Sequence, residues 1–465
     1  MAPGLSRVLK STSARLALAA FLVFNLNLRS ISSADTFPTR YLPIALLQGR
    51  GFNLDGFDFL RDSSYPVPEG ENSGLPYYLQ LRRGQWLSTY PVMPAILAMP
   101  VYALPVALGL TNGPKRLTGG YSRTEIVGTL LSKIAASAAS AAAVALVYLA
   151  LLRLTGRRAA FWIAVLFAFA TSTWSVSSQG AWQTSYSGPL LAGAALYFLL
   201  ARDMARRRHA VGAGACLALA VACRPTAGIF ALLLTAYVFR HHRRDFWAFL
   251  ACPAVVGILL VAYNFFFFGT ILGGYTGKYV AAFVFTLPQV AVGTYGLLLS
   301  ANRGMLVLSP VLLVSFAGLI HVLLRRDDPL LLHLALGILA TILFYSTFTA
   351  WYGTFSFSYR YLVDLVPLLA LFVPRVSAWF VGSPWRRRGM ATLAAYSVGV
   401  QIVGSFFYPC GWYRSPVRDP AALSRIFSWR DMEVVQCLRS GPVYPDGLRL
   451  FRQETTRHPE RSNDR

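Results

Sequence analysis

Long apolar runs separated by short polar segments recur along most of the chain. Many of these runs approach the roughly 20 residues that an α-helix needs to cross a bilayer. The pattern predicts an all-α polytopic membrane protein with about eleven transmembrane helices. Their approximate bounds are 14–31, 126–152, 159–178, 187–201, 209–223, 226–240, 246–267, 304–324, 329–350, 361–380 and 390–409.

The segment 88–110 is also apolar and long enough to cross, but it contains prolines, which disturb a helix. If it does not cross, the arginine clusters between spans all fall on the side of the N-terminus, as the cytoplasmic preference of Lys and Arg requires. These clusters are Arg153/Arg157/Arg158, Arg202/Arg206/Arg207/Arg208, Arg240/Arg243/Arg244, Arg325/Arg326 and Arg386/Arg387/Arg388. We therefore expect a cytoplasmic N-terminus, an outer C-terminus, and 88–110 re-entrant or along the outer interface.

Composition agrees with this interpretation. Hydrophobic residues make up 55% of the 465 residues and charged residues 13%, about half the charged share of a soluble domain. The net charge of +24 is explained by the basic inner loops, so nucleic-acid binding is not expected. We expect a transmembrane domain over 1–410, with a long first outer loop at about 32–125 that contains interfacial helices. A short extracytoplasmic tail would follow over 411–465.

The first apolar run allows two interpretations. Arg7, Lys10 and Arg15 precede it, and the letters SSA before Asp35 resemble the cleavage site of a secretory signal. An uncleaved first span has the same features. We favour the uncleaved span because the residues that follow resemble part of a site.

The cysteines and histidines lack the spacing of metal ligands, so no metal or other cofactor is predicted. Cys216, Cys223 and Cys252 lie in or at apolar runs. Cys410 and Cys437 fall in or near the tail, where they either form a disulfide or remain free thiols.

Asp35 stands directly after the first apolar run, at the expected outer surface. Thr36 and Pro38 then indicate the start of a helix. A carboxylate fixed at this boundary suits a general base, and Arg29 or Arg40 is near enough in sequence to be its cation. The alternative is that Asp35 only marks the end of a span.

Arg224, in the sequence ACRPT, stands between two short apolar helices at the expected outer surface. Its planar guanidinium suits a phosphate, and the alternative is contact with lipid headgroups. Arg360 follows an aromatic stretch that contains Trp351 and Tyr352. It belongs to the same site or pairs with Asp364 on one face of a helix, and the aromatic residues alternatively form an interfacial belt.

The remaining candidates for substrate binding also lie in expected outer loops. Asp55 and Asp58 of the first loop bind an acceptor or a metal, or are ordinary loop acids. The others are Tyr275 and Lys278 in GGYTGKY and Arg303 in SANRGM.

Taken together, these features resemble the membrane glycosyltransferases of the GT-C fold. The resemblance rests on Asp35 after the first span, the long first loop, the RP between short helices, YNFFFFGT followed by GGY, NRGMLVLSP, and WYGTFSFSYRYL. It is strongest to relatives of the protein O-mannosyltransferases and of the lipid A aminoarabinose transferases, and it covers about residues 14–380. The tail has no recognisable counterpart.

The resemblance implies an inverting transfer at the outer face of the membrane. The sugar would come from a polyprenyl-phosphate donor and pass to a hydroxyl of a lipid, glycan or protein, with membrane lipids around the protein. Asp35 matches the family's base, Arg224 matches a basic residue near the lipid phosphate, and Lys278, Arg303 and Arg360 are weaker matches. The first loop lacks a tight Asp-Glu pair, so no metal is implied.

Three other functions remain open. A polyprenyl-glycan polymerase or ligase would share the outer-face cations, and a non-catalytic member of the fold would not use Asp35. A secondary transporter would place ionisable groups near the midplane and often show inverted repeats. Here Lys133 is the main buried charge in a predicted span, and no convincing repeat is evident.

Overall fold

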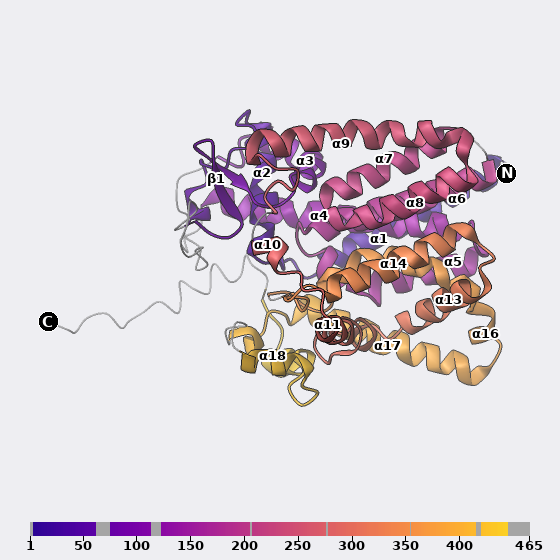
Figure 1. The fold of residues 1–465 in the computed structure, drawn as a ribbon. Coiled ribbons are helices and arrows are strands. Elements are labelled where there is room, and N and C mark those ends of the chain that lie inside the picture. The colour runs from indigo at the N-terminus through magenta and orange to yellow at the C-terminus, as the bar shows by residue number, and fades with distance from the viewer. Residues whose placement is uncertain are drawn as a thin grey trace.

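The structure is a computed structural model that describes residues 3–61, 75–112, 122–204, 207–275, 278–353, 355–414 and 420–444. Helices dominate it, and most of the long ones run roughly parallel in one bundle (Figure 1). This confirms the predicted all-α class. Parts of the predicted first loop and the end of the predicted tail lie outside the described residues.

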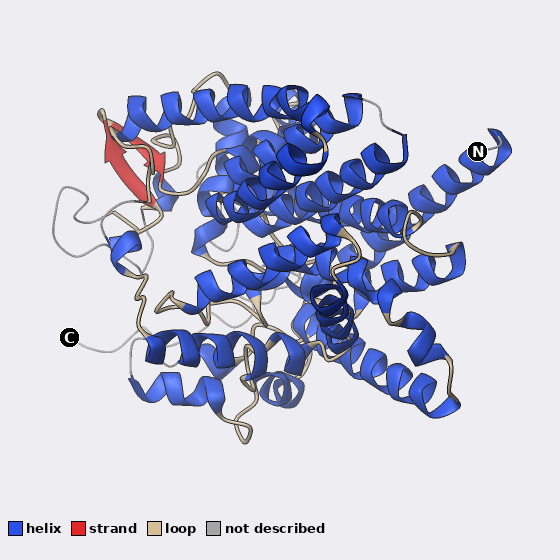
Figure 2. Cartoon of the chain, turned by 45° about the vertical axis from the view of Figure 1, so that its right-hand side comes forward, coloured by secondary structure: helices blue, strands red, loops and turns tan. Residues whose placement is uncertain are grey.

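The helices of the first half of the bundle are joined by both short and long connections. They are α1 (Pro3–Asn25), α2 (Phe37–Leu47), α3 (Met93–Ala107), α4 (Arg123–Leu151), α5 (Arg157–Phe169), α6 (Gln183–Met204), α7 (Arg207–Cys223) and α8 (Gly228–His241). A two-stranded antiparallel hairpin, β1 (Leu79–Arg82) and β2 (Gln85–Ser88), pairs Leu79 with Ser88 and lies at one end of the bundle (Figure 2).

The second half contains longer helices and several short ones. They are α9 (Phe246–Phe268), α10 (Lys278–Ala281), α11 (Leu287–Leu299), α12 (Met305–Leu308), α13 (Leu312–Arg325), α14 (Pro329–Ser346), α15 (Val366–Leu369), α16 (Ser377–Val381), α17 (Pro384–Phe406), α18 (Pro420–Phe427) and α19 (Glu433–Ser440). Short 3₁₀ segments include η1 (Ala34–Thr36), η4 (Pro225–Ala227), η6 (Arg360–Leu365) and η7 (Ala370–Arg375).

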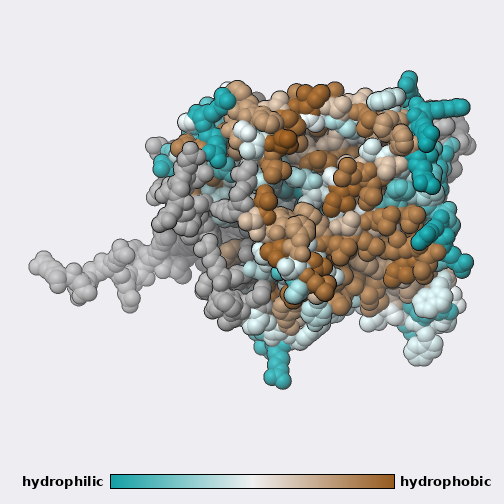
Figure 3. All heavy atoms as spheres, viewed as in Figure 1, coloured by the Kyte–Doolittle hydropathy of each residue, from teal (hydrophilic) through white to brown (hydrophobic). Residues whose placement is uncertain are grey.

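Among the described residues, five helices are long and apolar enough to cross a membrane. They are Arg123–Leu151, Gln183–Asp203, Arg243–Phe268, Pro329–Ser346 and Pro384–Phe406, and each overlaps a predicted span. The count of eleven spans remains a prediction. Hydrophobic side chains cover the middle of the molecule, and hydrophilic side chains collect at the edge where the N-terminal helix begins (Figure 3).

Small residues let the central helices approach closely. On α4, Ser132, Ala136, Ser137 and Ser140 are at most 1% exposed, and this helix contacts α1 and α6. Side chains of this size allow membrane helices to pack backbone against backbone. The outer helix α9 differs, because only 6% of its most apolar 18-residue stretch is buried inside the protein.

Two stretches have a secondary structure that the apolar pattern did not indicate. The stretch 361–380 is apolar, but it forms a succession of short segments, η6, α15, η7 and α16, instead of one helix. Pro367 and Pro374 lie within this stretch, where each removes a backbone donor. The stretch 268–303, expected to be an outer loop, contains the 13-residue apolar helix α11. The doubtful segment 88–110 contains α3, which packs against α2 and α4.

The C-terminal segment is fastened to the bundle. Cys410 and Cys437 form a disulfide, which settles the alternative left open by the sequence. Asn302 uses its amide nitrogen to donate to the carbonyl of Arg425 at 2.9 Å, and its side-chain oxygen accepts from the backbone N–H of Glu433 at 2.6 Å. The NRG motif therefore holds the tail.

Candidate active site

Asp35 is held by the short connection between α1 and α2. The backbone N–H of Ile31 donates to the carbonyl of Gln179 at 2.9 Å, and Lys133 donates to the carbonyls of Phe24 and Ser178. These bonds fasten the end of α1 to the turn before α6. As predicted, a helix then starts, because Asp35 lies in η1 and α2 follows with a proline in its first turn.

The carboxylate of Asp35 has donors on both oxygens. One oxygen accepts from the hydroxyl of Tyr77 at 2.5 Å and from that of Tyr90 at 3.3 Å. The other accepts from the guanidinium of Arg360 at 2.7 Å. The side chain of Asp35 is still 24% exposed, so a reacting group can approach it.

The prediction that Arg29 or Arg40 is the cation beside Asp35 was wrong. The guanidinium of Arg29 donates to the carbonyl of Tyr408 at 3.0 Å, and that of Arg40 donates to the hydroxyls of Ser32 and Thr129. The ion pair with Asp35 comes from Arg360, a residue of η6.

Arg360 is buried among aromatic rings at the start of η6. Its guanidinium lies 4.7 Å from the ring centre of Trp182 and 4.9 Å from that of Tyr361. The guanidinium remains charged at any ordinary pH. Rings that lie this close stabilise such a cation electrostatically, so Arg360 is fixed in orientation beside Asp35.

Arg224 lies between α7 and η4, where the sequence predicted a break between two short helices. It forms an ion pair with Asp364 at 2.7 Å and donates to the carbonyl of Tyr361 at 3.0 Å. Asp364 is buried and also accepts from the hydroxyl of Ser187 at 3.0 Å. The alternative pairing of Arg360 with Asp364 on one helix face was therefore wrong, since Asp364 pairs with Arg224.

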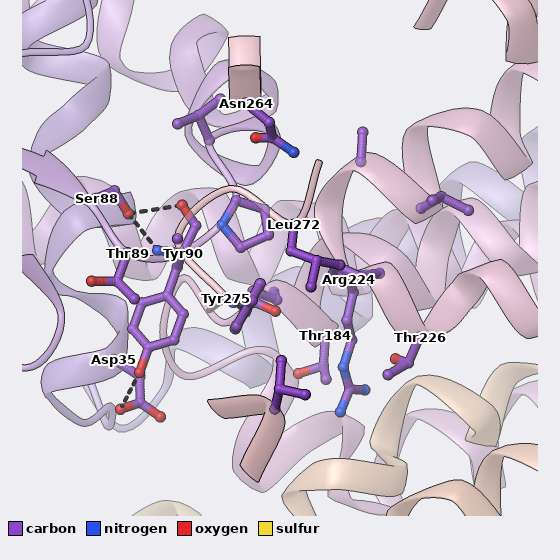
Figure 4. A pocket seen from close by; sticks show the side chains of 18 of the residues that line it. Asp35, Ser88, Thr89, Tyr90, Thr184, Arg224, Thr226, Asn264, Leu272 and Tyr275 are labelled. Atoms are coloured by element: carbon purple, nitrogen blue, oxygen red, sulfur yellow. Dashed lines mark hydrogen bonds between the residues drawn. The ribbon is translucent and has the colours of Figure 1, made fainter. Parts of the chain in front are cut away.

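A cavity of about 560 Å³ connects these groups. Asp35, Arg224 and Arg360 all line it. Figure 4 shows Asp35 and Tyr90 on one side of the cavity and Arg224 with Thr184 on the other.

The rest of the cavity wall is largely apolar. It comes from α9, from the chain that follows α9, and from α14. The apolar lining residues include Leu260, Phe268, Ile271, Leu272, Val280, Phe283, Phe285, Phe344 and Phe348. Several of them, such as Phe285 at 75% exposed and Ile271 at 62%, also lie on the outer surface of the protein.

Two loops that line the cavity come into contact at Gly274 and Thr89. A Cβ at Gly274 would lie 2.2 Å from the carbonyl oxygen of Thr89, so only glycine fits there without a shift. The carbonyl of Gly274 accepts from the side chain of Gln80 at 3.0 Å. The next residue, Tyr275, lines the cavity and accepts from Gln183 at 2.7 Å.

The predicted residues Asp55, Asp58, Trp351 and Tyr352 lie outside the cavity lining. Asp55 accepts from the backbone N–H of Trp86 at 2.6 Å and so holds the β-hairpin, while Asp58 begins a 3₁₀ turn at the surface. Trp351 is buried and packs edge-on against Tyr352. Lys278 begins α10, and its side chain lies outside the described residues.

Arg303 is fully buried below the tail. It forms an ion pair with Glu433 at 2.7 Å and donates to the carbonyl of Tyr352 at 2.9 Å. Its role in the structure is to join the tail to the loop that precedes Arg360.

Sequence reasoning missed several groups that line the cavity or contact Asp35. Tyr77 and Tyr90 lie on either side of the β-hairpin, and Trp182 precedes α6. A tyrosine in a loop has no local signal that identifies a distant carboxylate as its partner.

The arrangement defines the class of fold. The helical bundle has the GT-C fold, which it shares with solved structures of oligosaccharyltransferases. The oligosaccharyltransferase of Archaeoglobus fulgidus, tethered to an acceptor peptide with the NVT sequon, aligns with a TM-score of 0.52 and 14% identity over 85% of this chain and 55% of its own.

Two further structures are similar. The AglB oligosaccharyltransferase of Archaeoglobus fulgidus, in complex with an inhibitory peptide and a dolichol-phosphate, aligns with a TM-score of 0.50 and 11% identity over 85% of this chain and 55% of its own. ArnT from Cupriavidus metallidurans, bound to undecaprenyl phosphate, gives a TM-score of 0.47 and 13% identity over 87% and 70%. No protein-family model and no curated protein matches the sequence.

Proposed function

We propose that the protein is an inverting glycosyltransferase that moves a sugar from a polyprenyl-phosphate donor to a hydroxyl acceptor. The observation that carries this proposal is a cavity lined by two unlike sets of side chains. A carboxylate and two guanidiniums line it, and so do apolar side chains that continue to the outer surface. A sugar phosphate with a prenyl tail has the same division.

Asp35 would act as the general base. It would remove the proton of the acceptor hydroxyl while the oxygen attacks the anomeric carbon of the sugar. Its donors, Tyr77, Tyr90 and Arg360, would fix the direction of the carboxylate. A base that approaches from the face opposite the phosphate gives inversion.

Arg224 and Arg360 would stabilise the departing phosphate. The leaving group is a stable anion, so it needs positive charge more than it needs a proton donor. Arginine presents several donors in a plane that matches phosphate oxygens. Tyr275 lines the cavity, and Lys278, at the start of α10, would complete the pocket for the donor. No step requires a metal or another cofactor.

The reaction would take place at the extracytoplasmic face. Two independent observations support this orientation. The arginine-rich loops would lie in the cytoplasm if the N-terminus does. The disulfide between Cys410 and Cys437 would then form outside, in the kind of compartment where disulfides persist.

The AglB structure that contains a dolichol-phosphate also supports a lipid-linked donor, because this chain shares its fold. The acceptor is a lipid, glycan or protein hydroxyl in the proposal. A polymerase or ligase of lipid-linked glycans would use the same cavity with a longer donor. The two functions differ in whether the protein accepts a monosaccharide on a prenyl monophosphate as its donor.

The test is transfer of a radiolabelled sugar from a synthetic short-chain polyprenyl monophosphate. The purified full chain would be incubated with a panel of donors and membrane-extract acceptors, and the label followed into product. We expect transfer from at least one monophosphate donor, with loss of transfer when Asp35 is replaced by Asn. Transfer from diphosphate-linked oligosaccharides alone would favour the polymerase or ligase alternative.

A further inference from the structure

The two guanidiniums of the cavity each have a carboxylate partner, but the two pairs differ in accessibility. In the pair of Arg224 with Asp364, both side chains are at most 5% exposed, and Asp364 does not line the cavity. In the pair of Arg360 with Asp35, both residues line the cavity, and the Asp35 side chain is 24% exposed. A ligand in the cavity can therefore reach the second pair directly.

The two oxygens of Asp35 have different partners. The hydroxyls of Tyr77 and Tyr90 both donate to Oδ1. Among the described residues, Arg360 is the group that donates to Oδ2, at 2.7 Å. If another anion took over the hydrogen bond that Arg360 donates to Oδ2, the tyrosines would still hold the carboxylate, and Oδ2 would become free to accept a proton.

A phosphate that enters the cavity competes with Asp35 for Arg360. Both anions need the same guanidinium nitrogens, and charge-assisted hydrogen bonds to a phosphate are strong. Arg360 cannot turn far from its place, because the rings of Trp182 and Tyr361 lie against it. The simplest consequence of this geometry is that the phosphate and Asp35 compete for the same fixed cation.

We infer that the donor phosphate displaces Asp35 from Arg360, so that donor binding itself frees the general base. This inference rests on the proposed function and adds an order of events to it. Before the donor binds, Asp35 is paired with Arg360, which occupies Oδ2. After the donor binds, Arg360 faces the phosphate and Oδ2 faces the acceptor.

The sugar is then transferred to the acceptor in one step. The acceptor oxygen forms a bond to the anomeric carbon as the bond from that carbon to the phosphate oxygen breaks. The acceptor proton passes to Oδ2 of Asp35, and the electron pair of the broken bond leaves with the prenyl phosphate. The extra negative charge on that phosphate lies beside Arg360 and Arg224.

Binding of an unreactive probe tests the inference without using turnover. The probe is a short-chain polyprenyl monophosphate without a sugar, titrated into the purified full chain at fixed ionic strength. Removing the competing carboxylate with Asp35→Asn should tighten binding roughly tenfold, which corresponds to about 1.4 kcal/mol. Asp35→Ser should give the same direction of change, and thermal unfolding shows whether each variant is folded.

A double-mutant cycle separates competition from a general charge effect. In the Arg360→Gln background the probe should bind more weakly, and adding Asp35→Asn should then change the affinity less than about twofold. If the tightening persists undiminished without Arg360, the effect is only that of a lost negative charge, and the inference is wrong.

A matched control removes a carboxylate elsewhere. Asp327 pairs with Arg375 at 3.1 Å, and neither residue lines the cavity. Asp327→Asn should leave probe affinity unchanged. If Asp35→Asn binds the probe no more tightly than the parent, the inference fails while the proposed function survives. If the parent and all variants fail to bind the probe, both fail together.

Discussion

Asp35 and Arg360 are separated by 325 residues in the sequence, yet a carboxylate oxygen of the first lies 2.7 Å from a guanidinium nitrogen of the second. The pair joins η1 to the start of η6. It brings the candidate base and a candidate phosphate ligand into direct contact.

The first prediction concerns turnover by Asp35→Asn. The amide keeps the shape of the side chain but cannot accept the proton, and a positioned base contributes about 10²- to 10⁴-fold in rate. We expect kcat to fall by that amount while the apparent affinity for the donor rises. Steady-state transfer assays at varied donor concentration measure the two separately. A parental kcat would show that Asp35 only ends a span.

The second prediction separates the structural role of Arg224 from its role in binding. Arg224→Ala leaves the buried carboxylate of Asp364 without its ion pair, which should lower the free energy of unfolding by about 3–5 kcal/mol. The double variant Arg224→Ala with Asp364→Ala should recover most of this stability. Its affinity for a prenyl phosphate should remain low, because the cation is absent. Thermal unfolding and probe titration, run on the same samples, distinguish these outcomes.

The substitution Arg224→Lys provides a second measure of the same site. Lysine keeps the charge but cannot donate in the planar arrangement that suits a phosphate. We expect intermediate donor affinity, between those of the parent and the double Ala variant. Full affinity in the Lys variant would mean that the guanidinium geometry is unimportant.

The third prediction concerns the contact between the two loops at Gly274. An added methyl group would lie 2.2 Å from the carbonyl oxygen of Thr89, so Gly274→Ala must separate the loops. A displacement of about 1 Å at a reaction site can lower the rate by about 100-fold. Gly257→Ala is the control, since no atom lies within 4 Å of the position a Cβ would take there. Equal turnover by the two variants would show that the loop contact does not position the site.

The fourth prediction concerns the disulfide. Cys410 and Cys437 are 27 residues apart, and closing a loop of this size contributes about 3–4 kcal/mol in the chain-entropy description. Replacing both by Ser should destabilise the tail and loosen its contact with Arg303. Replacing the free Cys252 by Ser should not. Thermal unfolding monitored by tryptophan fluorescence, which includes the buried Trp412, would show the difference.

The fifth prediction concerns orientation. A phosphatase reporter that is active only outside the cytoplasm should be active when fused to the C-terminus and inactive in the loop between α6 and α7. The reason is the arginine content of that loop. Activity in the α6–α7 loop would reverse the proposed orientation and move the cavity to the cytoplasmic face.

The sequence predicts the parts of the site that have a local signal. A carboxylate directly after an apolar run and a proline-broken junction between two helices can be recognised from adjacent letters, so Asp35 and Arg224 were both chosen. The partner of Asp35 could not be predicted in this way. The local candidates for its cation, Arg29 and Arg40, bind elsewhere, and only the folded bundle brings Arg360 beside it.

The same reasoning explains the errors in the fold. Hydropathy detects that residues are apolar, but not whether a helix through them is continuous, so the broken segment from η6 to α16 was read as one span. Arg303 was chosen because arginine at the start of a span suggests an anion site. Its partner Glu433 lies in the tail, 130 residues away, and no local pattern indicates that pairing.

The exposure of α9 has a consequence for the cavity. One face of this helix provides Leu260, Tyr263, Asn264 and Phe268 to the cavity wall, while most of its surface points away from the protein. In a membrane, acyl chains would press on the back of the same wall, so bilayer thickness and lateral pressure would act on the width of the cavity. Detergent micelles would not reproduce that pressure. We therefore expect donor affinity to depend on acyl-chain length in lipid nanodiscs.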